Sequence, residues 1–141
     1  MQHLHSFLRY IVLLLLVLAI IRSLMGWLSK KNFTGGDASI GLFLMITAHT
    51  QLLLGLFLYM TQGWLGLAMK DAMAEPEQRF WKVEHLTGMV IAIVLITIGR
   101  MRAKRLSEDL RKHKTSFIYY TIALVIILGS IPWQADRWLI P

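Results

Sequence analysis

The sequence predicts an all-α integral membrane four-helix bundle, with residues 1–141 forming a single transmembrane domain. Two observations lead to this prediction. Hydrophobic residues make up 56% of the chain and charged residues only 16%, which is less charge than a soluble domain of this length carries. The apolar residues also gather in four runs, each near the roughly 20 residues that a helix needs to cross a hydrocarbon core of about 30 Å.

The four apolar runs predict helices at about 7–28, 38–60, 83–99 and 116–133. Backbone polar groups in lipid must be satisfied within their own segment, which favours helices over open strands. Arg9 precedes the first run as in a signal peptide, but Arg22 follows it and no small-residue cleavage site appears, so we expect a retained helix. The chain has no cysteine, which excludes disulfides and thiolate metal sites.

The connections between the predicted helices carry most of the basic side chains. A polar turn at 29–37 follows the first helix, and a longer connection at 61–78 follows the second. A strongly basic segment at 100–114 follows the third helix, and we expect that helix to continue through it into water. The positive-inside rule places the first and third connections in the cytoplasm, and both termini then lie outside. The net charge of +7 is thus explained by topology, and we expect no nucleic-acid partner.

Histidines in or near the apolar runs are the candidate functional residues. Ionisable side chains inside a membrane helix are costly and so mark functional sites by default. His49 lies near the middle of the second predicted helix, His85 near the outer end of the third, and His5 at the outer end of the first. Two imidazoles on facing helices are what bis-histidine haem ligation needs. Alternatively, each ring only hydrogen-bonds to a neighbouring helix.

Depth along the helices restricts the pairs. At a rise of about 1.5 Å per residue, His5 lies about 33 Å above the cytoplasmic level, His85 about 25 Å and His49 about 15 Å. His5 and His49 are too far apart in depth to ligate one iron, whereas His85 can pair with either. Arg9 shares a helix face with His5, where it can bind a haem propionate, pair with Glu84 or snorkel to the headgroups. The cofactor-binding candidates are therefore His85, His49, His5 and Arg9, with the three histidines as candidate ligands of a haem iron.

Small residues near these histidines have two interpretations. Gly88 and Gly99 fall near the His85 face of the third predicted helix, and Gly55 follows His49 on the second. They can leave room for a flat macrocycle, or they can allow close helix packing.

Three segments carry a family resemblance: residues 3–10 (HLHSFLRY), 48–55 (AHTQLLLG) and 83–85 (VEH). With these segments, nearly the whole chain resembles short bacterial membrane proteins labelled cytochrome B and, more loosely, the cytochrome b561 bundles. The resemblance implies a multi-pass protein of the bacterial inner membrane that holds haem b. Its expected role is electron transfer between a quinone and another membrane redox subunit, or within a homo-oligomer, and any enzyme activity would be that of a membrane oxidoreductase component. The fourth predicted helix has no histidine, unlike many of the b561 bundles, which favours one haem or none over two.

Two other functions stay open. His3, His5 and His85 can bind copper or zinc at the outer surface, since imidazole is a good ligand for both ions. A cofactor-free membrane subunit or assembly factor is the second, with histidines that only join helices. In the basic segment, we expect His113 at the surface and the cationic side chains against anionic lipid headgroups.

Overall fold

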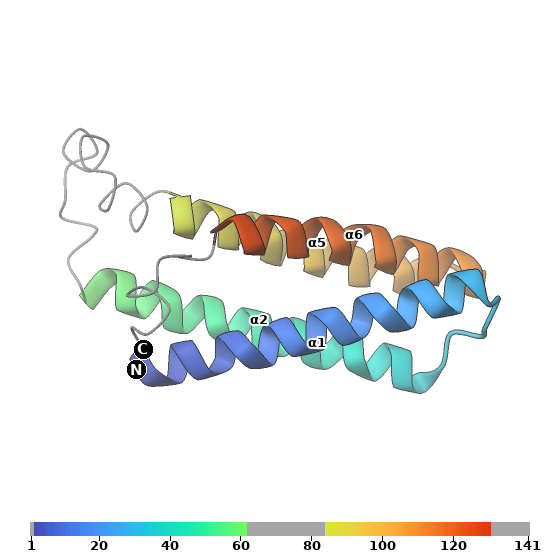
Figure 1. Ribbon diagram of the computed structural model, residues 1–141, viewed down its shortest axis with the longest axis horizontal. Helices are drawn as coiled ribbons and strands as arrows, with labels where there is room; N and C mark the ends of the chain where they lie inside the picture. Colours follow the sequence, from blue (N-terminus) through green and yellow to red (C-terminus); the bar gives the residue numbers. More distant parts are fainter. Residues whose placement is uncertain (1, 62–83, 131–141) are drawn as a thin grey trace.

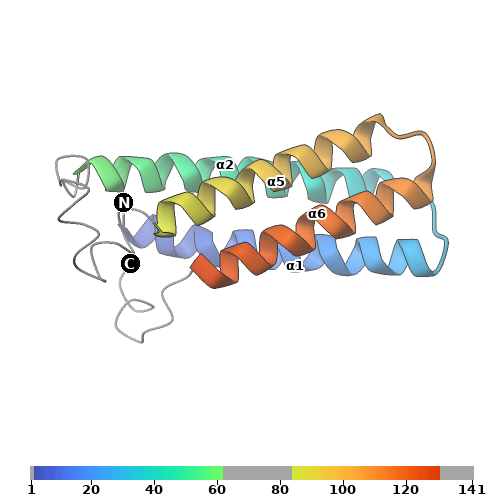
Figure 2. The ribbon, with the colours of Figure 1, turned by 90° about the horizontal axis from the view of Figure 1, so that it is seen from above.

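The computed structural model describes residues 2–61 and 84–130, and in these ranges it contains four helices and no strand. This confirms the all-α bundle. The helices run alternately up and down the bundle (Figure 1), and each packs against two neighbours in the order α1, α2, α5, α6 and back to α1. α1 and α5 are therefore diagonally opposed in this order of packing, and Figure 2 shows the α5–α6 pair crossing over the α1–α2 pair at an angle. The bounds are α1 Gln2–Leu28, α2 Gly35–Thr61, α5 His85–Arg105 and α6 Asp109–Ser130.

The helices extend further than predicted at the basic end of the bundle. α5 continues to Arg105, which confirms the expected extension beyond residue 99, but the predicted start of α6 at 116 is wrong, because it begins at Asp109. Lys, Arg and Leu are good helix formers in water as well as in lipid, so the apolar run marks less than the whole helix. The basic segment 100–114 is therefore mostly helical, with residues 106–108 as the break.

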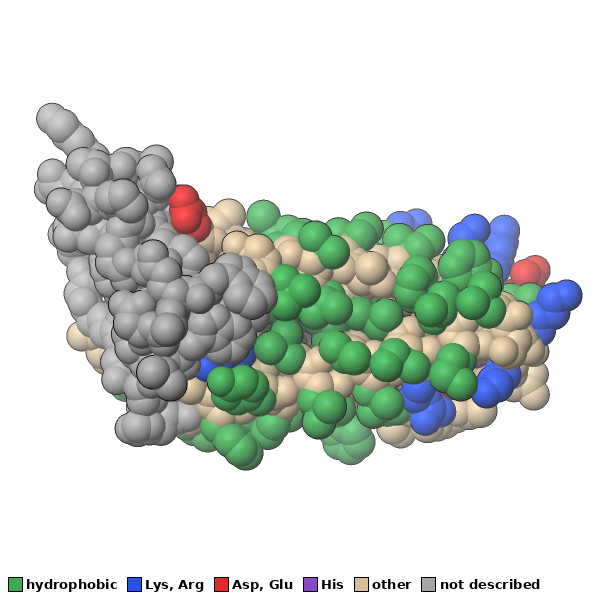
Figure 3. Space-filling model, viewed as in Figure 1, with side chains coloured by type: hydrophobic (Ala, Val, Ile, Leu, Met, Phe, Trp, Pro, Cys, Tyr) green, Lys and Arg blue, Asp and Glu red, His purple; other side chains and the backbone are tan. Residues whose placement is uncertain are grey.

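The outer surface of the bundle is apolar. Leu14, Leu53 and Val125 are 69%, 68% and 63% exposed. Figure 3 shows hydrophobic side chains across the middle of the bundle and Lys and Arg at the end where α5 meets α6. Three helices, α1, α2 and α5, are long and apolar enough to cross a membrane. An extended apolar exterior needs lipid rather than water around it, so this is a membrane protein. The apolar run of α6 continues beyond the described residues, and its crossing stays a prediction.

Small residues set the spacing of the bundle. Leu16, Leu44 and Ile96 are fully buried in the centre. Alanines from all four helices surround them, which lets the helix backbones approach closely, as membrane bundles require. These are Ala19, Ala48, Ala92 and Ala123.

Capping interactions terminate α1. Lys30 adopts a left-handed conformation with φ of 53°, and the Lys31 N–H donates to the Gly26 carbonyl at 2.9 Å. This 6→1 bond is that of a Schellman motif, which satisfies a carbonyl left over at a helix end. The chain is thereby turned back toward α2.

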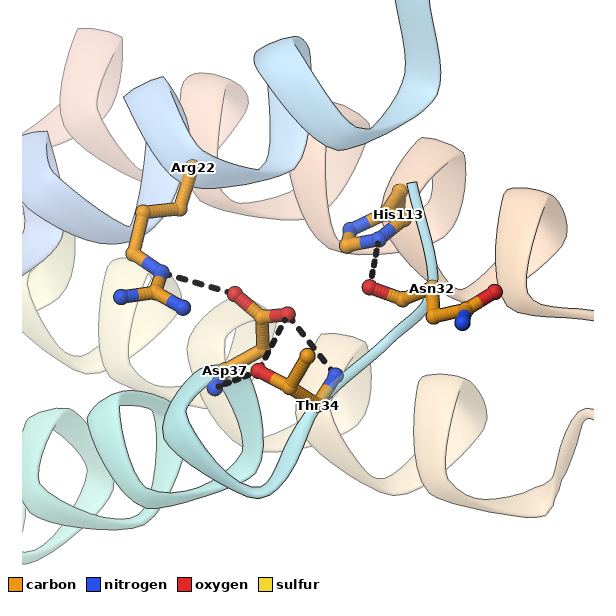
Figure 4. Close-up of polar contacts among 5 residues, drawn as sticks. All are labelled: Arg22, Asn32, Thr34, Asp37 and His113. Atoms are coloured by element: carbon orange, nitrogen blue, oxygen red, sulfur yellow. Dashed lines mark hydrogen bonds and ion pairs between the residues drawn. The ribbon is translucent and has the colours of Figure 1, made fainter. Parts of the chain in front are cut away.

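A reciprocal cap starts α2. The Thr34 hydroxyl accepts from the Asp37 N–H at 3.3 Å, and the Asp37 carboxylate accepts from the Thr34 N–H at 2.9 Å. This is a capping box with Asp in the place of Glu. Arg22 of α1 donates to the same carboxylate at 2.7 Å, so the cap also joins α1 to α2 (Figure 4).

Candidate functional site

His5 lies at the end of the bundle that is remote from the capped turn. Its ring is within electrostatic range of the His85 ring and of the Arg9 guanidinium. Gly55 of α2 gives the ring its space, because a Cβ there would lie 3.2 Å from Cε1 of His5. Gln51 of α2 donates to the His5 backbone carbonyl at 2.7 Å. Within the described ranges, the buried Nδ1 of His5 has no hydrogen-bond partner.

His85 is oriented by α6. Its Nδ1 lies 2.9 Å from the backbone carbonyl oxygen of Ser130. A carbonyl oxygen only accepts, so Nδ1 carries the proton and the lone pair of the neutral ring is on Nε2. Metal-ligating histidines commonly donate their other ring N–H to a carbonyl in this way. The bond therefore joins α5 to α6 and sets the tautomer that ligation through Nε2 requires.

His49 lies apart from the other two rings. Its side chain is exposed on the outer surface of α2, and its Nδ1 lies 2.8 Å from the Met45 carbonyl of its own helix. The structure thus places His85 within electrostatic range of His5, one of the two pairs that depth allows, and His49 on the outer surface.

Arg9 belongs to the same end as His5. Its guanidinium donates to the Tyr10 hydroxyl at 3.3 Å and stands 4.9 Å from the centre of the Tyr10 ring. It also lies within electrostatic range of both His5 and His85. The cationic side chain therefore lies within electrostatic range of both imidazoles, about one turn of α1 after His5.

Gly88 and Gly99 serve close packing between α5 and α6. A Cβ on Gly88 would lie 2.8 Å from Cβ of Ser130, and one on Gly99 would lie 2.5 Å from Cβ of Tyr119. Neither glycine borders open space, so the packing interpretation holds for both. The space beside His85 is taken by the α6 backbone to which the ring bonds.

Few side chains that can bind a metal lie together in the described part of the chain. Among the described residues, no group of three or more His, Asp or Glu side chains lies close enough to hold a metal ion. The His3 side chain lies outside that description, so the copper or zinc alternative is an open prediction. Two imidazoles are fewer than the three or four protein ligands of a zinc site, but they are the number that a haem iron takes axially.

His113 shows where the sequence-based prediction was wrong. Expected at the surface, it is only 2% exposed. Its Nε2 donates to the Asn32 carbonyl at 3.3 Å, and its ring centre lies 5.3 Å from that of Phe33 (Figure 4). The signal was present in the spacing, because His113, Ser116 and Tyr120 begin the buried face of α6. The high charge of residues 100–114 obscures that helical periodicity in the sequence.

No known family, curated protein or solved structure matches this chain. The function must therefore be inferred from the chemistry of the site itself.

Proposed function

We propose that this membrane protein transfers electrons through one b-type haem held between α1 and α5, with His85 and His5 as axial ligands. The observation that carries the proposal is the contact of His85 Nδ1 with the Ser130 carbonyl, which leaves the imidazole lone pair on Nε2. A bis-histidine iron needs that tautomer on a ring held by a second contact.

The arrangement of the helices supports His5 as the opposite ligand. α1 and α5 are diagonally opposed, so side chains that point inward from them approach one axis from opposite sides. In that arrangement His5 and His85 would hold a haem iron between the two helices. His5 also has a buried ring nitrogen without a partner in the described ranges, and that ring is within electrostatic range of His85.

The remaining parts of the site have distinct roles in this proposal. A bound haem supplies the one-electron chemistry, while the chain supplies axial imidazoles, an apolar surround and a cation. Arg9 is the residue placed to pair with a propionate, because charge-assisted bonds from Arg to carboxylates are strong and directional. We place the protein in a bacterial inner membrane, crossing four times with both termini outside, between a quinone and a further redox subunit.

A cofactor-free membrane subunit is the second candidate. The same His85 contact favours it, because a bond from a ring N–H to a carbonyl of the next helix is also a common way to join helices in lipid. The bond from Gln51 to the His5 carbonyl joins α1 to α2 in the same manner. In this alternative the cluster holds the helix ends together and binds nothing.

Absorption spectroscopy separates the two candidates. The protein, produced with added haem and purified in detergent, should show the absorption spectrum of a low-spin b-type haem after a reductant is added. His85→Ala and His5→Ala should each abolish that spectrum while the protein still inserts and elutes as a folded species. His49→Ala is the matched control, since it makes the same change in a ring that faces outward. Wild-type protein with no Soret band after haem supplementation would refute the haem and support the cofactor-free subunit.

A further inference from the structure

A cavity of about 280 Å³ lies at the basic end of the bundle, remote from His5 and His85. It is lined by residues of all four helices and of the turn between α1 and α2. Four cationic side chains and one carboxylate give the lining a net charge of +3. They are Arg22, Asp37, Arg100, Lys104 and Lys112.

Two of these cations have partners inside the protein. Arg22 is paired with Asp37 at 2.7 Å, as Figure 4 shows, so these two charges balance. The ammonium of Lys112 stands 5.3 Å from the centre of the Phe33 ring.

Arg100 and Lys104 are the two remaining cations of the lining, and Arg100 lies within electrostatic range of the Tyr120 hydroxyl. In the ranges 2–61 and 84–130, neither side chain makes a hydrogen bond or an ion pair. They lie four residues apart on α5, which places them on one face of the helix, and both line the cavity. Two like charges held together in this way favour an anion between them.

The position of the cavity along the helices corresponds to the level of the lipid headgroups. Its lining includes Arg22, which precedes the end of α1 at Leu28 by about 9 Å along the helix axis. The same lining takes in the first turn of α2 and the last turns of α5, which are ends of helices able to cross a membrane. Basic pockets between membrane helices commonly hold phosphate-bearing headgroups.

We propose that this cavity binds one phosphate group, held by Arg100 and Lys104. An Arg guanidinium matches phosphate oxygens with a fork of donors, and Lys adds a compact charge. A water occupies about 30 Å³ in the liquid, so 280 Å³ accommodates a phosphate with several waters. The phosphate is either the phosphodiester of an anionic lipid or a soluble phosphate. The inference is independent of haem binding, since it concerns the opposite end of the bundle.

Native mass spectrometry and thermal unfolding test the proposal on the full chain in uncharged detergent. The added probes are phosphatidylglycerol, phosphatidylcholine with the same acyl chains, and inorganic phosphate. Wild-type protein should retain one phosphatidylglycerol more tightly than phosphatidylcholine if the phosphate is that of a lipid. Stabilisation by inorganic phosphate in the absence of lipid would identify the soluble source instead.

Three paired variants decide whether the cavity is responsible. Arg100→Gln with Lys104→Gln should weaken binding of the effective probe by about tenfold or more. Arg100→Lys with Lys104→Arg keeps both charges and should retain binding. Lys31→Gln with Arg105→Gln makes the same change of charge at the same end but outside the cavity lining, and should have little effect. Equal loss in the two Gln pairs, or no binding of any phosphate probe to wild type, would overturn the proposal.

Discussion

The contact between Gly26 of α1 and His113 of α6 allows a quantitative test of the packing. A Cβ on Gly26 would overlap the imidazole and lie 2.6 Å from its Nδ1. The ring is buried and cannot swing into solvent, so Gly26→Ala must displace α6 or strain the ring. Overpacking of this kind costs about 1–3 kcal/mol.

Removing the ring is also destabilising. His113→Ala leaves a cavity between α1, α6 and the turn at Phe33, and it removes the bond to the Asn32 carbonyl. Deleting a buried side chain of this size costs about 2–5 kcal/mol. The 3.3 Å bond is long, so its own share is small, about 0.5 kcal/mol. We expect a total loss of about 2–5 kcal/mol.

The double variant, which combines Gly26→Ala with His113→Ala, carries the sharpest expectation. The methyl group added at position 26 would fill part of the space that the ring leaves, so the double variant should be more stable than the sum of the single effects by about 1–3 kcal/mol. Unfolding in mixed micelles, followed by tryptophan fluorescence, gives the four stabilities. Gly129→Ala is the control, because no atom lies within 4 Å of its would-be Cβ. It should change stability by less than about 1 kcal/mol, in the stabilising direction. If the two single changes in stability add to within about 0.5 kcal/mol, the ring does not occupy the place where a Cβ on Gly26 would lie.

Two further predictions concern the cap and the topology. Thr34→Ala removes the hydroxyl that accepts from Asp37 and should lower stability by about 1 kcal/mol in the same micelles, while Thr34→Ser should not; an unchanged midpoint for the Ala variant would contradict the capping box. Because the chain has no cysteine, cysteines introduced singly at Lys31 and Ser107 should resist an impermeant thiol reagent in intact cells, while one at Glu75, outside the described residues, should react. The opposite pattern of labelling would invert the orientation.

The basic segment shows how far hydropathy carries a prediction. Apolar runs located the helices, because only helices satisfy their own backbone in lipid. They did not show that only residues 106–108 separate α5 from α6, because residues with high helix propensity continue both helices into water beyond the apolar runs. His113 was misplaced for the same reason.

What the sequence by itself determined is the helical class and the positions of the apolar runs, and it predicted His85 as the shared member of any histidine pair. These follow from composition and from a rise per residue, which are properties of one segment at a time. Only the tertiary structure decided that His5 lies within electrostatic range of His85, that His49 faces outward, and that Arg100 and Lys104 line one cavity. The direction in which a helix presents its side chains depends on its rotation against its neighbours, and the small residues that bring the four helices together set that rotation.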